Sequence, residues 1–153
     1  MLTAIATLNS KGKYVPPMLI FKGAYHLRKH FNNTINLNTL WARSDTGFSN
    51  DRLGLKYLKH FNQYTKNQKV GKYRLLVFDS YGSYLTQDFV DYCWQNYIRP
   101  FLLPPYLTHI LQPLDIRIFQ TLKKYFKDAI RDLVFIGAID VDKELFLQQF
   151  QLF

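Results

Sequence analysis

Two aspartates stand in surroundings that could support metal chemistry. Asp79 ends the apolar run Leu75 to Phe78, and Asp115 closes a proline-rich stretch ahead of an amphipathic segment. Ligand sites of parallel sheets lie beyond the carboxyl ends of the strands, where Asp79 is placed. Two carboxylates brought together there could hold a hard divalent cation such as Mg²⁺, leaving positions open for phosphate oxygens and water. Each aspartate alone is better explained as a loop or helix-capping residue, so the hypothesis depends on the pair.

The composition favours one globular domain with a polyanionic partner. A chain of 153 residues with 48% apolar content can bury a core, and a formal charge of +9 with 17% aromatic residues suits nucleic acid. The one cysteine, Cys93, excludes an internal disulfide and a cysteine-rich zinc site, and its apolar neighbours predict a buried thiol. No apolar run reaches the roughly 18 residues that span a bilayer. We therefore expect a soluble intracellular protein without a membrane partner.

The first third of the chain predicts a β-hairpin. Strand-forming residues fill Leu2 to Leu8 and Tyr14 to Phe21, with turn residues between them. Pro16-Pro17 indicates a sheet edge or a bulge. An exposed edge or apolar flank on the first strand would favour self-association. From Gly23 to Gly47 the sequence predicts a loop-rich connection, with one short strand around Thr34 to Leu37.

The middle of the chain predicts a helix followed by a parallel βαβ unit. Ser49 to Asp51 offers caps for a helix with an apolar stripe of Leu53, Leu55, Tyr57, Leu58 and Phe61. Leu75 to Phe78 is typical of a strand covered on both faces. Thr86 would cap a helix running to about Asn96, and Ile98 to Leu103 would form the next buried strand. The residues expected to face inward from that second helix are Phe89, Val90, Cys93, Trp94 and Tyr97.

After Asp115 the apolar residues from Phe119 to Leu133 recur at the helical period. Lys123, Lys124 and Lys127 occupy the other faces, and they are either a row of phosphate contacts or a solvated surface. A last amphipathic piece extends from Lys143 to Phe153. The elements together predict an α/β fold with a mixed sheet, an antiparallel hairpin plus a parallel unit, flanked by helices.

The two aspartate segments resemble a known family. Phe78 to Thr86, Leu103 to Pro105, Thr108-His109 and Leu111 to Asp115 are similar to the DDE superfamily endonuclease domain of pogo/Tigger-type transposases and centromere-protein-B-like proteins. Leu2 to Gly23 resembles the second and third strands of that domain. Trp41-Ala42 and Gly47 resemble its middle segment, so that the resemblance extends to about Arg131.

The resemblance implies an RNase H-like fold and three aspartates that bind two Mg²⁺ or Mn²⁺ ions for DNA cleavage and strand transfer. Asp79 and Asp115 match the second and third of these aspartates. The first is expected on a strand ahead of Leu2, so residues 1–153 are expected to form a single, partial endonuclease domain. The family further implies DNA as the partner and the nucleus as the location.

Four other residues are candidates to orient groups around the ions or to contact substrate: Ser83, Tyr81, Tyr84 and His109. The family usually has histidines where this chain has Tyr81, Tyr84 and Tyr106, whereas His109 keeps its expected place. Phenols can donate hydrogen bonds but do not titrate near neutral pH as imidazoles do. Packing around the loops is the alternative role of these side chains.

Two classes of function remain. The leading hypothesis is a transposase-derived endonuclease domain with two of three metal-binding aspartates, weakly active or inactive and binding its ion weakly. The alternative is a noncatalytic nucleic-acid or protein interaction module on the same fold, or a transposon relic.

Overall fold

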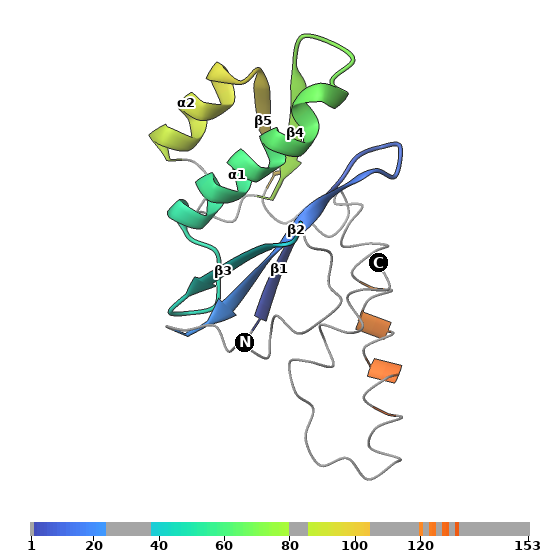
Figure 1. The fold of residues 1–153 in the computed structure, drawn as a ribbon, viewed down its shortest axis with the longest axis vertical. Helices are drawn as coiled ribbons and strands as arrows, with labels where there is room; N and C mark the ends of the chain where they lie inside the picture. Colours follow the sequence, from blue (N-terminus) through green and yellow to red (C-terminus); the bar gives the residue numbers. More distant parts are fainter. Residues whose placement is uncertain are drawn as a thin grey trace.

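The computed structural model describes residues 2–23, 38–79 and 86–104, together with residues 120, 123, 124, 127, 128 and 131. Three strands come first along these ranges, and helices and strands follow (Figure 1). In chain order they are β1 Leu2–Leu8, β2 Tyr14–Lys22, β3 Leu40–Ser44, α1 Asp51–Thr65, the 3-10 helix η2 Lys66–Gln68, β4 Arg74–Phe78, α2 Gln87–Gln95 and β5 Ile98–Leu102.

The first sheet, sheet A, has the strand order β1-β2-β3, with β1 antiparallel to β2 and β2 parallel to β3. The predicted hairpin is confirmed. Its register shifts between Ile5 and Thr7, so that Pro16 and Pro17 together face Ala6. A bulge therefore accommodates two prolines that have no amide hydrogen to donate to a ladder. Because β2 lies in the middle of the sheet, the bulge explains the prolines and an edge position does not. Within the described part of sheet A, β1 and β3 are the edge strands.

Strand β3 was not predicted. It lies in the region expected to be loop-rich, and it pairs with β2 so that Leu19 is opposite Trp41. Phe21 and Trp41 stack with ring centroids 5.6 Å apart. Five residues with no clean alternation are too short for a sequence pattern, and the pairing with β2 decides their conformation. The short strand expected around Thr34 to Leu37 lies outside the described residues.

Helix α1 connects sheet A to the rest of the fold. Of the candidate caps from Ser49 to Asp51, Asn50 is the one that caps it, because its side-chain oxygen accepts a hydrogen bond from the Leu53 amide over 3.0 Å. Leu53 and Tyr57 bury against the β2 and β3 core, while Leu58 and Phe61 join a second core beneath the other sheet. His60 is also buried, and its Nε2 donates to the Pro16 carbonyl over 2.8 Å.

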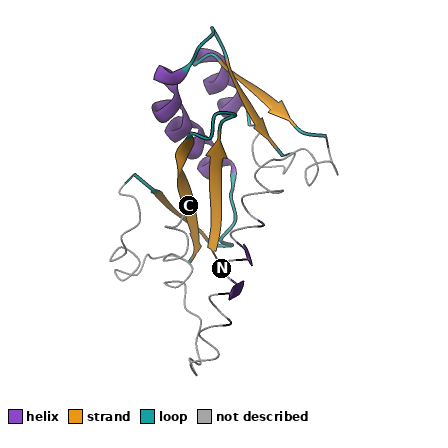
Figure 2. Ribbon diagram, turned by 90° about the vertical axis from the view of Figure 1, so that its right-hand side faces the viewer, coloured by secondary structure: helices purple, strands orange, loops and turns teal. Residues whose placement is uncertain are grey.

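Sheet B consists of β4 and β5, which are parallel and joined through α2. The predicted βαβ unit is thus confirmed. Thr86 caps α2 by accepting from the Phe89 amide over 3.3 Å. Cys93 is fully buried, as expected, and it packs with Phe89 and Ile98 against the far end of α1. Helix α1 therefore contacts both sheets (Figure 2).

The expectation that sheet B is covered on both faces was wrong. Leu75, Val77 and Phe101 are 65%, 45% and 51% exposed. Only the alternate residues of β4, Leu76 and Phe78, pack against the helices, because successive side chains of a strand point to opposite faces.

The predicted burial of two residues, one in α2 and one in the turn that follows it, was also wrong. Trp94 and Tyr97 were expected to point inward, but they are 56% and 47% exposed. Trp94 is on a face of α2 that the core does not reach. Tyr97 follows the helix with a φ of 56°, in the left-handed region that few non-glycine residues adopt.

Candidate metal site

Asp79 lies at the carboxyl end of β4, where the sequence predicted it. The Leu103 amide donates to the Phe78 carbonyl over 2.9 Å, so the chain after β5 runs beside the start of the Asp79 loop. The Asp79 side chain is partly buried. Within the described part of the chain, its carboxylate accepts no hydrogen bond and pairs with no cation. Oxygens left open in this way suit a hard divalent ion, which takes carboxylate ligands and retains water.

Asp115 and the four accessory candidates, Ser83, Tyr81, Tyr84 and His109, lie outside the described residues. The topology still constrains where the Asp115 segment begins. It leaves sheet B after Leu103, next to Phe78. This is the carboxyl end of the two strands, where Asp79 also lies. The meeting of the two carboxylates stays a prediction.

Among the described residues, no three or more histidine, cysteine, aspartate or glutamate side chains form a group that could hold a metal ion. Asp79 is thus the one sequence-predicted ligand whose position the structure describes. The remaining ligands are predictions from the motif.

All three lysines of the predicted phosphate-contact row are among the described residues. Lys123, Lys124 and Lys127 are helical and exposed. Arg131 forms an ion pair with Asp128 over 3.3 Å on the same helical stretch, with both side chains well exposed. These positions fit both interpretations of the row, phosphate contact and solvated face.

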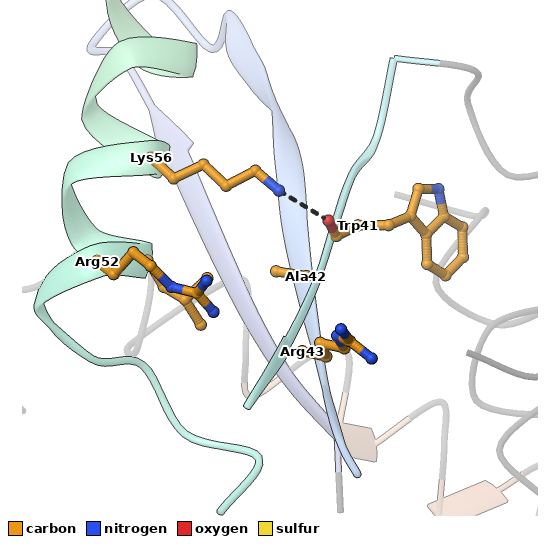
Figure 3. Close-up of a pocket in the computed structure, with 6 residues that line it drawn as sticks. Trp41, Ala42, Arg43, Arg52 and Lys56 are labelled. Carbon is orange, nitrogen blue, oxygen red and sulfur yellow. Dashed lines mark hydrogen bonds between the residues drawn. The ribbon is translucent and has the colours of Figure 1, made fainter. Parts of the chain in front are cut away.

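A basic hollow between β3 and α1 was not predicted (Figure 3). It has a volume of about 240 Å³, and Arg43, Arg52 and Lys56 supply its three cations. The Lys56 amino group donates to the Trp41 carbonyl over 3.3 Å. A second hollow of about 250 Å³ shares Arg43 and Arg52 and adds Asp45 to its lining. Arg52 and Lys56 are four apart on α1, but only the pairing of β3 brings Arg43 beside them. The first hollow can accept an anionic group such as a phosphate.

The fold and the Asp79 position agree with a comparison to protein families. The model of the DDE superfamily endonuclease family matches residues 1–144. The chain therefore belongs to this family. Its mixed sheet A, parallel sheet B and two helices are consistent with the RNase H-like fold expected from the sequence.

One curated relative contains a similar segment. The chain is 33% identical over 149 residues to a protein of Cochliobolus lunatus named as the MFS-type transporter clz9. The match covers 97% of this chain but only 16% of that protein, so the chain spans a small part of its relative. No helix among the described residues is long and apolar enough to cross a membrane. No solved structure gives a significant match.

Proposed function

We propose that this chain is a transposase-derived endonuclease module that binds DNA and cleaves it weakly on its own. The proposal rests on Asp79, whose carboxylate is unpaired among the described residues and lies at the carboxyl end of a parallel strand, in a chain of the DDE superfamily endonuclease family. The finer kinship to pogo/Tigger transposases rests on the sequence motif around Asp79 and Asp115. Function on DNA would place the protein in the nucleus.

Asp79 and Asp115 are the residues that would hold Mg²⁺ or Mn²⁺. A bound ion would supply a hydroxide at neutral pH and would stabilise charge on the leaving phosphate oxygen. The protein's own part is to fix the two carboxylates and to bring the phosphodiester to them. Positioning dominates such chemistry, because misplacement by about 1 Å can cost roughly 100-fold in rate.

Two carboxylates should hold an ion weakly. The family resemblance expects three, of which residues 1–153 supply Asp79 and Asp115. Without a third carboxylate, the ions would bind less tightly and would be positioned less accurately. The proposal therefore predicts DNA binding without efficient cleavage by the isolated chain.

Titration calorimetry with Mn²⁺ tests the metal site. The parent chain should bind weakly, and Asp79→Asn should weaken binding further because it removes one charged ligand. Asp91→Asn is the matched control, since Asp91 is an exposed carboxylate on α2 that accepts from Gln87. Equal Mn²⁺ binding by the parent and Asp79→Asn would remove Asp79 from the site. Equal loss in Asp91→Asn would show that only surface charge is being measured.

A further inference from the structure

A surface of mixed aromatic and basic residues lies at the end of sheet B opposite Asp79. We call it the aromatic-basic surface. It is formed by the loop before β4, the end of α2 and the start of β5, which meet at one end of the molecule (Figure 1). Its members are Lys69, Lys72, Tyr73, Trp94, Tyr97 and Arg99.

Arg99 organises this surface. Its guanidinium carbon is 3.7 Å from the centre of the Trp94 ring and 4.1 Å from that of Tyr73, so the cation contacts both rings. A cation this close to an aromatic face is electrostatically attracted to it. In the part of the chain that the structure describes, one guanidinium nitrogen of Arg99, Nη1, is buried without a hydrogen-bond partner. The rings are thus held in place by their contacts with the cation.

Tyr97 extends the row of rings. It lies 6.0 Å from Tyr73 between ring centres, and the Lys69 amino group is 5.2 Å from the centre of the Tyr97 ring. The Tyr97 backbone has a positive φ, a conformation that costs about 1 kcal/mol or more for a non-glycine residue. Its carbonyl accepts from the Arg74 amide over 2.9 Å, which fixes this conformation at the start of both strands.

The rings are available to a ligand. Tyr73, Trp94 and Tyr97 are all between 43% and 56% exposed. Large aromatic side chains usually bury most of their surface in a core, so a group of three exposed rings marks an interaction surface. The outward residues of sheet B, Leu75 and Phe101, continue the apolar character alongside them.

The charge of the surface selects an anionic partner. Residues 66–74 and 94–101 contain five lysines and arginines and neither aspartate nor glutamate. Within the described part of the chain, Lys69, Lys72 and Arg99 pair with no carboxylate. A polyanion would therefore gain ion contacts without breaking existing ion pairs.

We propose that the aromatic-basic surface binds an unpaired nucleic-acid strand, with bases stacked on Trp94 and Tyr97 and phosphates beside Lys69 and Lys72. Duplex bases are already stacked on one another and would leave the exposed rings unused. Each base stacked on an aromatic ring contributes roughly 1 to 3 kcal/mol, and every base has a face that can stack. The order of bases should therefore matter little.

This surface is separate from the candidate metal site. Tyr73 precedes β4 and Asp79 follows it, so the five residues of the strand separate them by about 20 Å at the rise of a strand. Binding of a strand here should not depend on Asp79. The two proposals can consequently fail independently of one another.

Tryptophan fluorescence tests the proposal directly. The chain has two tryptophans, and Trp41→Phe leaves Trp94 as the sole reporter while keeping the aromatic partner of Phe21. An oligothymidylate of twelve nucleotides should quench Trp94 emission, whereas a duplex of twelve base pairs should quench it far less. In a separate anisotropy titration, Trp94→Ala should weaken binding of the labelled oligothymidylate about tenfold.

Two double variants that remove the same charge distinguish binding at this surface from general electrostatic attraction to the protein. The double variant Lys69→Ala and Lys72→Ala should bind oligothymidylate with a weaker salt dependence. The slope of log binding constant against log salt concentration should become shallower by about 1.4, at roughly 0.7 per phosphate contact. Lys11→Ala with Lys13→Ala removes the same charge from the exposed β1–β2 turn and should change the slope less. Asp79→Asn should leave binding unchanged.

Four outcomes would overturn the proposal. They are Trp94 emission that does not respond to oligothymidylate, equal affinity and quenching with duplex, undiminished binding by Trp94→Ala, and equal effects of the two lysine pairs. Poly-glutamate that quenches Trp94 as strongly as oligothymidylate would assign the surface to an acidic protein instead.

Discussion

The guanidinium of Arg74 donates to the Asn62 side chain over 2.7 Å, joining the first residue of β4 to helix α1. The same group donates to Thr65 over 2.7 Å and to the Asn96 carbonyl over 2.8 Å. Asn62 in turn donates to the Asn96 side chain over 2.9 Å. Burial lowers the pKa of Arg74, yet an arginine stays charged at neutral pH, and these bonds offset the cost of desolvating it. One side chain thus connects the helix, the strand and the turn before β5.

Replacing Arg74 by Met should therefore destabilise the fold by about 2 to 4 kcal/mol. The apolar stem is kept, but three hydrogen bonds from a charged donor are lost and their acceptors stay partly buried. Urea unfolding followed by circular dichroism measures the change. Lys66→Met, at an exposed position of η2, is the control and should lie within about 0.5 kcal/mol of the parent. Equal stability of Arg74→Met and the parent would show that the network contributes nothing.

Cys93 should make the protein less stable at alkaline pH. Burial raises the pKa of its thiol from 9.0 to about 11, so the unfolded chain loses the proton first as pH rises. Between those two values the native state binds more protons, and the free energy of unfolding falls by up to about 2 to 3 kcal/mol. The difference in urea stability between the parent and Cys93→Ala, followed from pH 8 to 11, isolates this contribution from the tyrosines. A constant difference across that range would contradict the prediction.

The burial of Cys93 has a second measurable consequence. A thiol-specific reagent at pH 8 should label the native protein slowly and the urea-unfolded protein at once, because only an accessible thiolate reacts. Equally rapid labelling of both states would mean that Cys93 is accessible in solution.

The sequence predicted those parts of the fold that local chemistry decides. Thr86 was recognised as a helix cap and Asn50 was one of three candidate caps at Ser49 to Asp51, and β1, β2, β4 and β5 followed from their strand-forming residues. Strand β3 was missed, because Trp41 is held by its partner Leu19 on β2 rather than by its own sequence neighbours. The bulge and edge interpretations of Pro16-Pro17 could be separated only once β3 was known to lie on the far side of β2.

Side-chain direction at sheet B was harder to predict than strand position. The run Leu75 to Phe78 is apolar throughout, so its pattern does not reveal that one face is exposed. Trp94 was assigned to the core for its apolarity, although its partner is Arg99, a contact set by the start of β5. For the candidate site, the position of Asp79 followed from the strand before it. The basic hollow could not be found, because Arg43 reaches Arg52 only through β3.

The edge position of β1 predicts self-association. Its outer backbone groups can pair with another strand, and the described part of the sheet places no strand beyond it. We expect sedimentation velocity to show concentration-dependent association of the parent at tens of micromolar protein. Thr3→Lys should reduce this association, because a charge on an edge strand opposes pairing between copies. The control is Thr46→Lys, at an exposed bend after β3, which lies on the other side of β2 from β1. A parent that stays monomeric at those concentrations would contradict the prediction.

The cleavage assay decides how the two aspartates are used. We expect the carboxylates of Asp79 and Asp115 to lie about 4 to 8 Å apart, within reach of shared or water-bridged ions. The chain should retard DNA on a gel in a salt-sensitive and sequence-tolerant way, given its charge of +9, but should nick supercoiled DNA poorly with Mg²⁺ or Mn²⁺. Fusing a strand that ends in an aspartate ahead of Leu2 should raise nicking, and Asp79→Asn or Asp115→Asn in that fusion should abolish it. Strong nicking by the chain as it stands, lost in Asp115→Asn, would show that two aspartates suffice. Nicking by the fusion that survives both substitutions would show that neither aspartate holds the ion.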